Sequence, residues 1–236
     1  FGLDMNYLGG GAGALEAPGK PCLLTGHGLV GDSAVIALLQ SRSSVGVSHG
    51  WEVLKGPFRV TRSDRNTILE LDFKPAFEIY SNAVSDHSGS PLSRDSFFDI
   101  AKAYPFGIAR INSEQIVRDP VRVESNLGIV CVGEVPEGAL VSILHGSRSS
   151  LIQAAGNASH TAICEYPGST APDALLLIDC ISRVLFLQDR FDEEIAAAGQ
   201  SDRPLAGVCT LGEIACSGSE FLEFYNKTCV VAALEK

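Results

Sequence analysis

Hydrophobic residues occur along the chain in short runs that predict many strands and a few helices. Residues 174–180 form a continuous apolar run, which is typical of a strand buried on both faces of a sheet. Residues 182–198 follow at once with apolar side chains at helical spacing, and Gly199 ends the pattern. Three further segments have helical spacing: residues 74–84, 93–103 and 150–164.

Glycine and proline separate the apolar runs, and the 24 Gly and 11 Pro indicate many turns between short strands. Turn residues at 26–32 lie between apolar runs at 21–25 and 33–39, which predicts a hairpin with His27 at its tip. Other strands are predicted at residues 45–54, 58–61, 67–71, 104–112, 121–123, 127–132 and 139–144. The pattern predicts an α+β fold with mixed, mostly antiparallel sheets and flanking helices.

Residues 206–215 are small and rich in glycine, and they precede a predicted strand pair that is interrupted at Asn226-Lys227. Residues 8–15 and 34–39 repeat this order near the N-terminus, with a small-residue strand, a hairpin and an apolar closing strand. The similarity leads to the hypothesis of a duplicated α/β unit.

The net charge of −10 argues against binding to nucleic acid or to anionic membranes, both of which need a basic surface. Asp179 and Arg183 interrupt the longest apolar run, so no membrane insertion is expected. No signal peptide is visible, and the chain opens at Phe1 without a Met, so we expect a piece of a longer protein.

The seven cysteines have no disulfide-framework spacing, and no CxxC motif is present. This usage favours a reducing, cytoplasmic setting. The five histidines are scattered, without an HExxH motif or a histidine pair four residues apart. The sequence therefore predicts no metal site.

The first candidate site is the junction between the predicted strand at 174–180 and the helix that follows it. Ligands collect beyond the carboxyl ends of strands, where the first amides of a helix are unpaired donors. Arg183 offers a planar donor for a carboxylate, with Cys180 beside it. In the structural alternative, Arg183 pairs with an acid of the helix and Cys180 is packed in the core.

The second candidate site is the glycine-punctuated run and the turn that follows it. Its members are Cys209, Thr210, Gly212, Glu213, Tyr225 and Asn226. If the closing strands lie beside residues 174–180, these groups line the same crevice, where Glu213 would pair with an amine or with Arg183. Asn226 also suits an ordinary turn.

His49 lies between small residues and next to Trp51, an arrangement that predicts either a pocket or an ordinary half-buried histidine. An enzyme would need a nucleophile beside a base. No GxSxG motif is present, which leaves Cys180 or Cys209 with a distant histidine as the candidate nucleophiles.

Four stretches, taken in order, resemble the FIST family of sensory domains: residues 45–61, 67–80, 127–138 and 205–228. The resemblance implies that residues 1–72 are the tail of the FIST N-terminal region and residues 73–236 the FIST C-terminal region, within one compact unit. The family's common Cys-x-Gly-Arg pattern is Cys180-Ile-Ser-Arg183 in this chain.

The resemblance also implies a function. It points to a cytoplasmic input module in signal transduction that binds a small ligand such as an amino acid and acts on an output protein such as a histidine kinase. In that case Arg183 would bind the carboxylate of the ligand and Glu213 its amine. No cofactor is expected on this interpretation. Some family members bind haem and report nitric oxide, so a haem sensor is the first alternative, and an enzyme with a cysteine nucleophile is the second.

Overall fold

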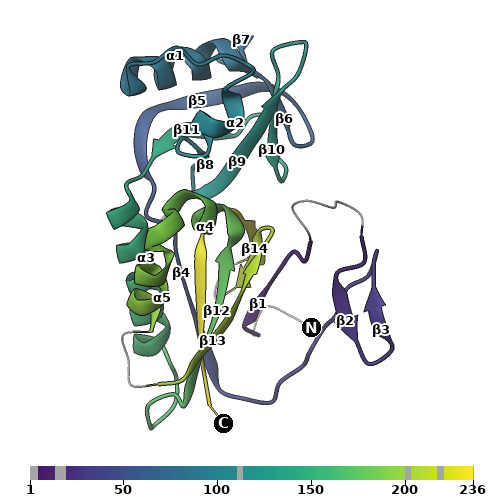
Figure 1. Ribbon diagram of the computed structural model, residues 1–236, viewed down its shortest axis with the longest axis vertical. Coiled ribbons are helices and arrows are strands. Elements are labelled where there is room, and N and C mark those ends of the chain that lie inside the picture. The colour runs from purple at the N-terminus through teal and green to yellow at the C-terminus, as the bar shows by residue number, and fades with distance from the viewer. Residues whose placement is uncertain (1–4, 14–19, 111–113, 200–202, 217–220, 236) are drawn as a thin grey trace.

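Two assemblies of strands, one above the other in Figure 1, make up most of the molecule. The computed structural model describes residues 5–13, 20–110, 114–199, 203–216 and 221–235. Most strand pairs in these ranges are antiparallel, and helices pack against both assemblies. The predicted α+β class with mixed, mostly antiparallel sheets is confirmed.

The upper assembly is a closed antiparallel barrel. Its strands are β5 (Glu52–Asp64), β6 (Thr67–Leu71), β8 (Phe106–Ile108), β9 (Ile116–Val123), β10 (Ile129–Val132) and β11 (Leu140–His145). Pairing of β10 with both β9 and β6 closes the ring, and the short β7 (Lys74–Pro75) extends β6. The helices α1 (Ala76–Ser88) and α2 (Phe97–Ala101) cover it, with Tyr80, Phe97 and Phe106 in the shared core.

The lower assembly is built on a four-stranded sheet, the central sheet, in the order β13 (Leu205–Thr210), β12 (Ala174–Cys180), β16 (Cys229–Leu234) and β4 (Ser43–Ser48). Only β12 and β13 run parallel. The helices α3 (Arg148–Cys164) and α5 (Phe191–Ala198) lie on one face (Figure 1). The alanines of α3 allow close packing, and a Cβ at Gly46 would overlap the carbonyl of Ala158.

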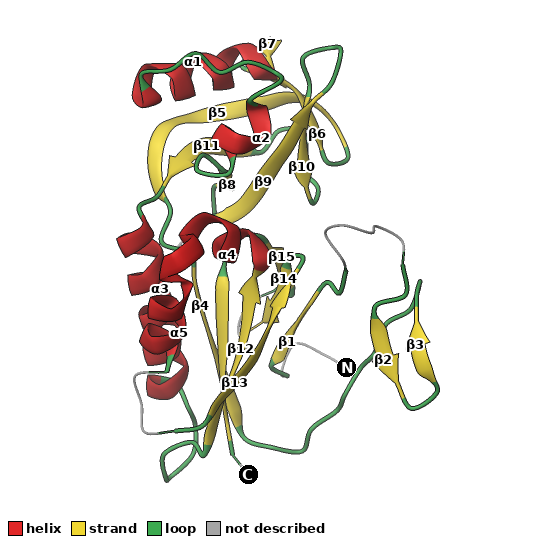
Figure 2. Cartoon of the chain, in the orientation of Figure 1, coloured by secondary structure: helices red, strands yellow, loops and turns green. Residues whose placement is uncertain are grey.

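A three-stranded sheet covers the other face, formed by β1 (Tyr7–Gly10), β14 (Glu213–Cys216) and β15 (Glu223–Tyr225). Val45, Ile178 and Val230 of the central sheet pack against Ala215 and Tyr225. The hairpin of β2 (Leu23–Thr25) and β3 (Gly28–Val30) stands to one side of the lower assembly (Figure 2).

Several predicted elements appear where the sequence placed them. The strand at residues 174–180 is β12, the helix at 150–164 is the main part of α3, and the interruption at Asn226-Lys227 separates β15 from β16. These last two strands belong to different sheets and do not pair with each other. Strands from both sides of the predicted 72/73 boundary share sheets, because β4 pairs with β16 and β5 with β11. The domain division itself stays a prediction.

The single helix predicted at residues 182–198 is wrong, because it is divided into α4 (Ile181–Leu187), a 3₁₀ turn η1 (Gln188–Arg190) and α5. Gln188 has a φ of 53°, which ends α4. In a straight helix, Arg183 and Glu194 are eleven steps apart and would be separated by about 16 Å along the axis. The break allows these two side chains to meet, so a tertiary contact overrides the local helical pattern.

The predicted hairpin has a different second strand. Residues 23–25 pair with 28–30 across a tight turn that holds the exposed His27, whereas residues 34–39 are extended and belong to no strand. The internal similarity therefore does not reach the closing strand, which in the second copy is the buried β16. The predicted helix at 93–103 is only α2, and the strand at 104–112 is only β8, with residues 111–112 outside the described part.

Candidate functional site

Buried polar side chains gather where β12 ends, between the barrel and the central sheet. We call this group the polar cluster. Its members are Asp119, Asp179, Arg183, Glu194, Thr210, Glu213, Asn226, Lys227 and Thr228, each of which is buried. Their number is unusual, because charged groups are rarely buried without partners.

Arg183 is the most highly connected residue of the polar cluster. Its side chain has no exposed surface, and its guanidinium forms ion pairs with Glu194 and, at 3.3 Å, with Asp179. The remaining donors bind three backbone carbonyls: His49 O at 2.7 Å, Leu151 O at 2.8 Å and Lys227 O at 3.1 Å.

These contacts correct the expected role of Arg183 as a carboxylate clamp. Every nitrogen of its guanidinium already donates to a protein group, so no free donor faces a ligand. The structural alternative, a pair with an acid of the following helix, is the arrangement observed. Arg183 joins the ends of β4 and β16 to α3 and α5, and its role is to hold these elements together.

Glu213 is fully buried at the start of β14 and forms no ion pair with Arg183, contrary to one of the two predicted pairings. One oxygen lies 3.0 Å from Thr210 Oγ1, and the other accepts the amide of Thr228 at 3.3 Å. Burial raises the pKa of Glu213 to about 8 and that of Asp179 to about 7. Both acids therefore retain protons at neutral pH to a degree unusual for carboxyl groups.

Lys227 connects the polar cluster to the barrel. Its ammonium is buried, donates to the carbonyl of Lys102 at 2.9 Å and lies 3.3 Å from Asp119 Oδ1 on β9. The other Asp119 oxygen accepts the hydroxyl of Ser182 at 2.8 Å. Protein groups thus occupy the start of α4, where the sequence predicted an anion site.

Sequence reasoning missed Asp119, Glu194, Lys227 and Thr228 as members of the cluster. A charge inside an apolar run was the available signal for Asp179, but Glu194 sits among other acids on its helix and carried no such signal. Its neighbours Asp192 and Glu193 are exposed.

The predicted residues of the second site lie in or beside the cluster, with one exception. Gly212 has a positive φ of 91° and packs on Asn226, whose amide donates to the carbonyl of Tyr225. Cys209 is exposed on the edge strand β13. Asn226 lies in the turn between β15 and β16, as the turn alternative predicted.

The cysteines do not resemble activated nucleophiles. Burial raises the pKa of Cys180 to about 12, and burial also raises the pKa of Cys209. A catalytic thiol needs the opposite shift, because the thiolate is the attacking species. These raised pKa values give no support to Cys180 or Cys209 as a nucleophile.

His49 is buried at the end of β4, where its Nδ1 accepts the amide of Trp51 at 2.9 Å. Burial and the charge of Arg183 lower the pKa of His49 to about 4, so the ring is neutral at neutral pH. Its carbonyl, rather than its ring, contacts Arg183. His49 therefore lies at the edge of the polar cluster, where its carbonyl accepts a hydrogen bond from Arg183.

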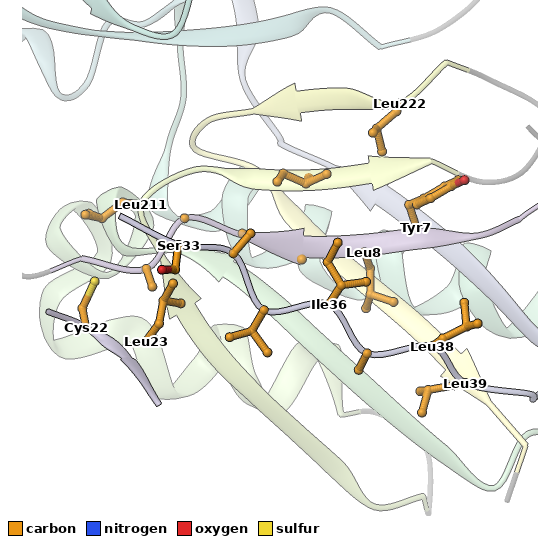
Figure 3. Close-up of a pocket in the computed structure, with 18 of the residues that line it drawn as sticks. Tyr7, Leu8, Cys22, Leu23, Ser33, Ile36, Leu38, Leu39, Leu211 and Leu222 are labelled. Atoms are coloured by element: carbon orange, nitrogen blue, oxygen red, sulfur yellow. The ribbon is translucent and has the colours of Figure 1, made fainter. Parts of the chain in front are cut away.

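A cavity of about 950 Å³ lies between β1 and residues 31–39, and Ser43 and Leu234 at the ends of two central-sheet strands also line it (Figure 3). Its walls are β1, the extended residues 31–39, Leu211 and Ile214, and most of the lining is apolar. None of the nine predicted site residues lines it, although Leu211 and Ile214 flank the predicted run. The apolar run at 34–39 is the sequence signal for this cavity, although its pattern predicts a strand.

Lys20 and Asp32 are the only charged residues among the described residues that line the cavity. Both are exposed and flank the base of the β2–β3 hairpin, where the amide of Cys22 donates to the carbonyl of Val30 at 3.1 Å and Gly31 lies against Pro21. One end of an apolar cavity therefore carries one positive and one negative group.

Metal and haem sites are not evident. Among the described residues, no group of three or more His, Cys, Asp or Glu side chains is arranged to hold a metal ion. No histidine lines the cavity. Across the described helices, none combines the length and apolar character that crossing a bilayer requires.

In comparisons with known proteins, the chain matches protein-family models. The FIST N domain model matches residues 1–74, and the FIST C domain model matches residues 76–216. Curated proteins and solved structures give no match. The matched C domain alone covers more than half of the chain, and FIST domains are sensory domains of signal transduction. The chain belongs to the FIST family of sensory domains.

Proposed function

We propose that this chain is the input module of a signalling protein and that it binds an amino acid with an apolar side chain in the cavity. The observation that carries the proposal is the pair Lys20 and Asp32 at one end of a largely apolar space. An amino acid presents the complementary pattern, since it has a carboxylate, an amine and an apolar side chain. Lys20 would bind the carboxylate and Asp32 the amine.

The size of the cavity favours the larger apolar amino acids and related metabolites. Ligand pockets measure about 300–1,000 Å³, and this cavity, at about 950 Å³, lies near the upper end of that range. Burial of apolar surface contributes about 25 cal/mol per Å², so a larger side chain gains more affinity. We therefore expect leucine or phenylalanine to bind more tightly than alanine.

The position of the cavity suits a sensor, because its walls come from both matched regions. β1 and residues 31–39 belong to the FIST N match, and Leu211 and Ile214 belong to the FIST C match. The amide of Gly11 donates to Gly212 O at 2.9 Å, and that of Leu211 donates to Gly11 O at 2.8 Å. A ligand that alters β1 would therefore act on the backbone beside Glu213 and the polar cluster.

The output is proposed to be a partner such as a histidine kinase that responds to movement of the elements around the buried polar cluster. Signal transfer requires that the ligand bind one conformation better than another. The buried ion pairs between β12, α4 and α5 give the cluster one tightly specified arrangement, which ligand-driven movement of β14 would disturb.

A thermal-shift screen against the standard amino acids tests the proposal. Wild-type chain should be stabilised by large apolar amino acids, by about 2.7 kcal/mol at a concentration 100-fold above the dissociation constant. Lys20→Met and Asp32→Asn should lose the shift. His27→Ala, at the exposed tip of the same hairpin, is the matched control and should retain it. A flat screen with wild-type chain would overturn the proposal.

The haem alternative is tested on the same samples. Axial ligation by histidine is not supported, since none of the histidines lines the cavity. A Soret band after incubation with haem, combined with a flat amino-acid screen, would favour the haem sensor instead.

A further inference from the structure

Residues 34–39 form an extended segment of apolar residues that belongs to no strand, and we call this segment the strap. All six residues are exposed. The four large side chains keep between 57% and 75% of their surface accessible: Val35, Ile36, Leu38 and Leu39. A contiguous exposed apolar surface of this kind marks a place where another group packs.

The strap is fixed at both ends but not along its length. Before it, the hydrogen bond from Cys22 N to Val30 O closes the base of the hairpin. After it, the hydroxyl of Ser41 donates to Glu235 O at 2.7 Å, and the amide of Glu235 donates to Arg42 O at 3.1 Å. Between these anchors, no backbone hydrogen bond joins the strap to another described residue. Its backbone can therefore move while the hairpin and the central sheet stay in place.

β1, across the cavity from the strap, has an outer edge that no described strand pairs. Its pairing in the described part of the chain is with β14. Gly11 forms its backbone hydrogen bonds with Gly212 and Leu211 on the β14 side. Because backbone groups alternate in direction along a strand, those of Leu8 and Gly10 point to the outer edge. Both residues line the cavity.

The strap and β1 run alongside each other in opposite directions. Figure 3 shows the strap passing from Ser33, near Leu211 and the end of β1, toward Leu39. Beyond that point, the side-chain amide of Asn6, just before β1, donates to Ser43 O at 2.7 Å. Two extended segments in this arrangement have the orientation that an antiparallel strand pair requires.

We propose that the strap is a lid that closes on the apolar side chain of a bound amino acid and pairs with the outer edge of β1 as an added strand. The inference rests on the proposed function, because the ligand supplies the apolar surface that fills the space between the strap and β1. Closure without a ligand would leave a void, which costs free energy. Closure on a ligand removes the apolar surfaces of both the strap and the ligand from water.

Closure also requires new backbone hydrogen bonds. Backbone groups that lose contact with water must find partners, so the strap pairs with β1 wherever the ligand does not separate them. The sheet of β1, β14 and β15 then gains a fourth strand. Ligand binding is thereby converted into a change of sheet structure and into the loss of an exposed apolar surface.

The test is hydrogen–deuterium exchange of the wild-type chain with and without saturating phenylalanine, with the heat of binding measured on the same samples. In the free chain, the strap amides should exchange at the rate of an unstructured peptide, because none has a backbone partner. Phenylalanine should slow their exchange by at least about tenfold, as expected for newly paired amides. The amides of α1, on the barrel, should not change.

Ile36→Ser should weaken phenylalanine binding by about tenfold, because less apolar surface is buried on closure. The matched control is Leu24→Ser, which should bind as the wild-type chain does. Leu24 has a similar exposed fraction, 78% against 75% for Ile36, but does not line the cavity. Both positions are exposed, so both variants should fold, and circular dichroism verifies this.

The results separate failure of the lid from failure of the site. Binding heat without slower exchange in the strap overturns the lid and leaves the amino-acid site standing. Strap amides that are already protected in the free chain overturn the lid as well, and so does equal affinity of Ile36→Ser and Leu24→Ser. Absence of binding heat overturns the amino-acid site, and the lid with it.

Discussion

Arg183 and Glu194 form a fully buried ion pair across the break between α4 and α5, with Arg183 Nε donating to Glu194 Oε1 at 2.7 Å. The pair fixes the end of β12 relative to α5. It also holds Arg183 where its other donors bind the carbonyls of β4, α3 and the turn before β16. The guanidinium of Arg183 therefore connects several elements of the lower assembly in its interior.

Glu194→Gln should destabilise the chain by about 3 kcal/mol, because removing one partner leaves the guanidinium of Arg183 buried with reduced compensation. Urea unfolding measures the effect. Glu193→Gln is the matched control, since Glu193 is exposed and pairs only with Arg190 on the surface. Equal unfolding midpoints for the two variants would contradict a stabilising role of the buried Arg183–Glu194 pair.

The double variant Arg183→Met with Glu194→Leu should cost less than the sum of the single changes. Removing both charges eliminates the uncompensated ion that each single variant leaves behind. A double-mutant cycle by urea unfolding measures this coupling, and additive costs would mean that the two side chains do not act as a pair.

Stability should fall as pH rises through the neutral range. The pKa of Glu213 is raised to about 8 by burial, against about 4.3 in an unfolded chain, so between these values the folded state binds more protons. The stabilising contribution is complete below the unfolded pKa and is lost as pH rises through the folded pKa. Asp179 contributes in the same direction up to about pH 7.

Glu213→Gln cannot ionise and should remove its share of this pH dependence, which is the whole of the fall expected between about pH 7 and about pH 8. Unfolding free energies from urea titrations between about pH 5 and about pH 9 test it. The exposed Glu165→Gln should follow the wild-type curve. If stability of the wild-type chain rises with pH across this range, the protonated state of Glu213 is excluded.

Gly46→Ala should destabilise the chain by at least about 2 kcal/mol. An added Cβ would overlap the backbone of α3 at Ala158, and neither backbone can move without disturbing the central sheet. Gly26→Ala, in the β2–β3 turn where nothing lies within 4 Å of an added Cβ, is the control. Similar melting temperatures for the two variants would contradict the close packing of β4 on α3.

Alkylation of native chain with iodoacetamide should modify Cys164 and Cys209 and spare Cys180. The first two thiols are exposed, whereas Cys180 is buried and burial raises its pKa to about 12. Peptide mass mapping measures the rates. Fast modification of Cys180 would show that its thiol is accessible and reactive, as a catalytic cysteine requires.

The sequence was informative where local pattern and burial agree. The apolar run of β12 and the alanine stripe of α3 gave both elements and their buried faces, because each pattern reports directly on core packing. The grouping of Thr210, Glu213 and Asn226 near the end of β12 was also predictable, since these residues flank strands that share one edge.

Features that depend on long-range contacts were not predictable. The break at Gln188 allows the contact between Arg183 and Glu194, and no local sequence pattern predicts this break. The cavity depends on how residues 31–39 lie against β1, a tertiary relationship that an apolar run alone does not encode. For the same reason, an arginine that looked available for a ligand is instead fully bound within the protein.

The most direct test of the proposed sensor is isothermal titration of wild-type chain, Lys20→Met and Asp32→Asn with phenylalanine, its amide and its N-acetyl derivative. We expect wild-type chain to prefer phenylalanine by about tenfold over each derivative, which corresponds to about 1.4 kcal/mol. Lys20→Met should bind the acid and the amide equally, and Asp32→Asn should bind the free and acetylated amines equally. If both variants retain the wild-type preferences, or if wild-type chain binds none of the three compounds, an amino-acid site at the base of the hairpin is contradicted.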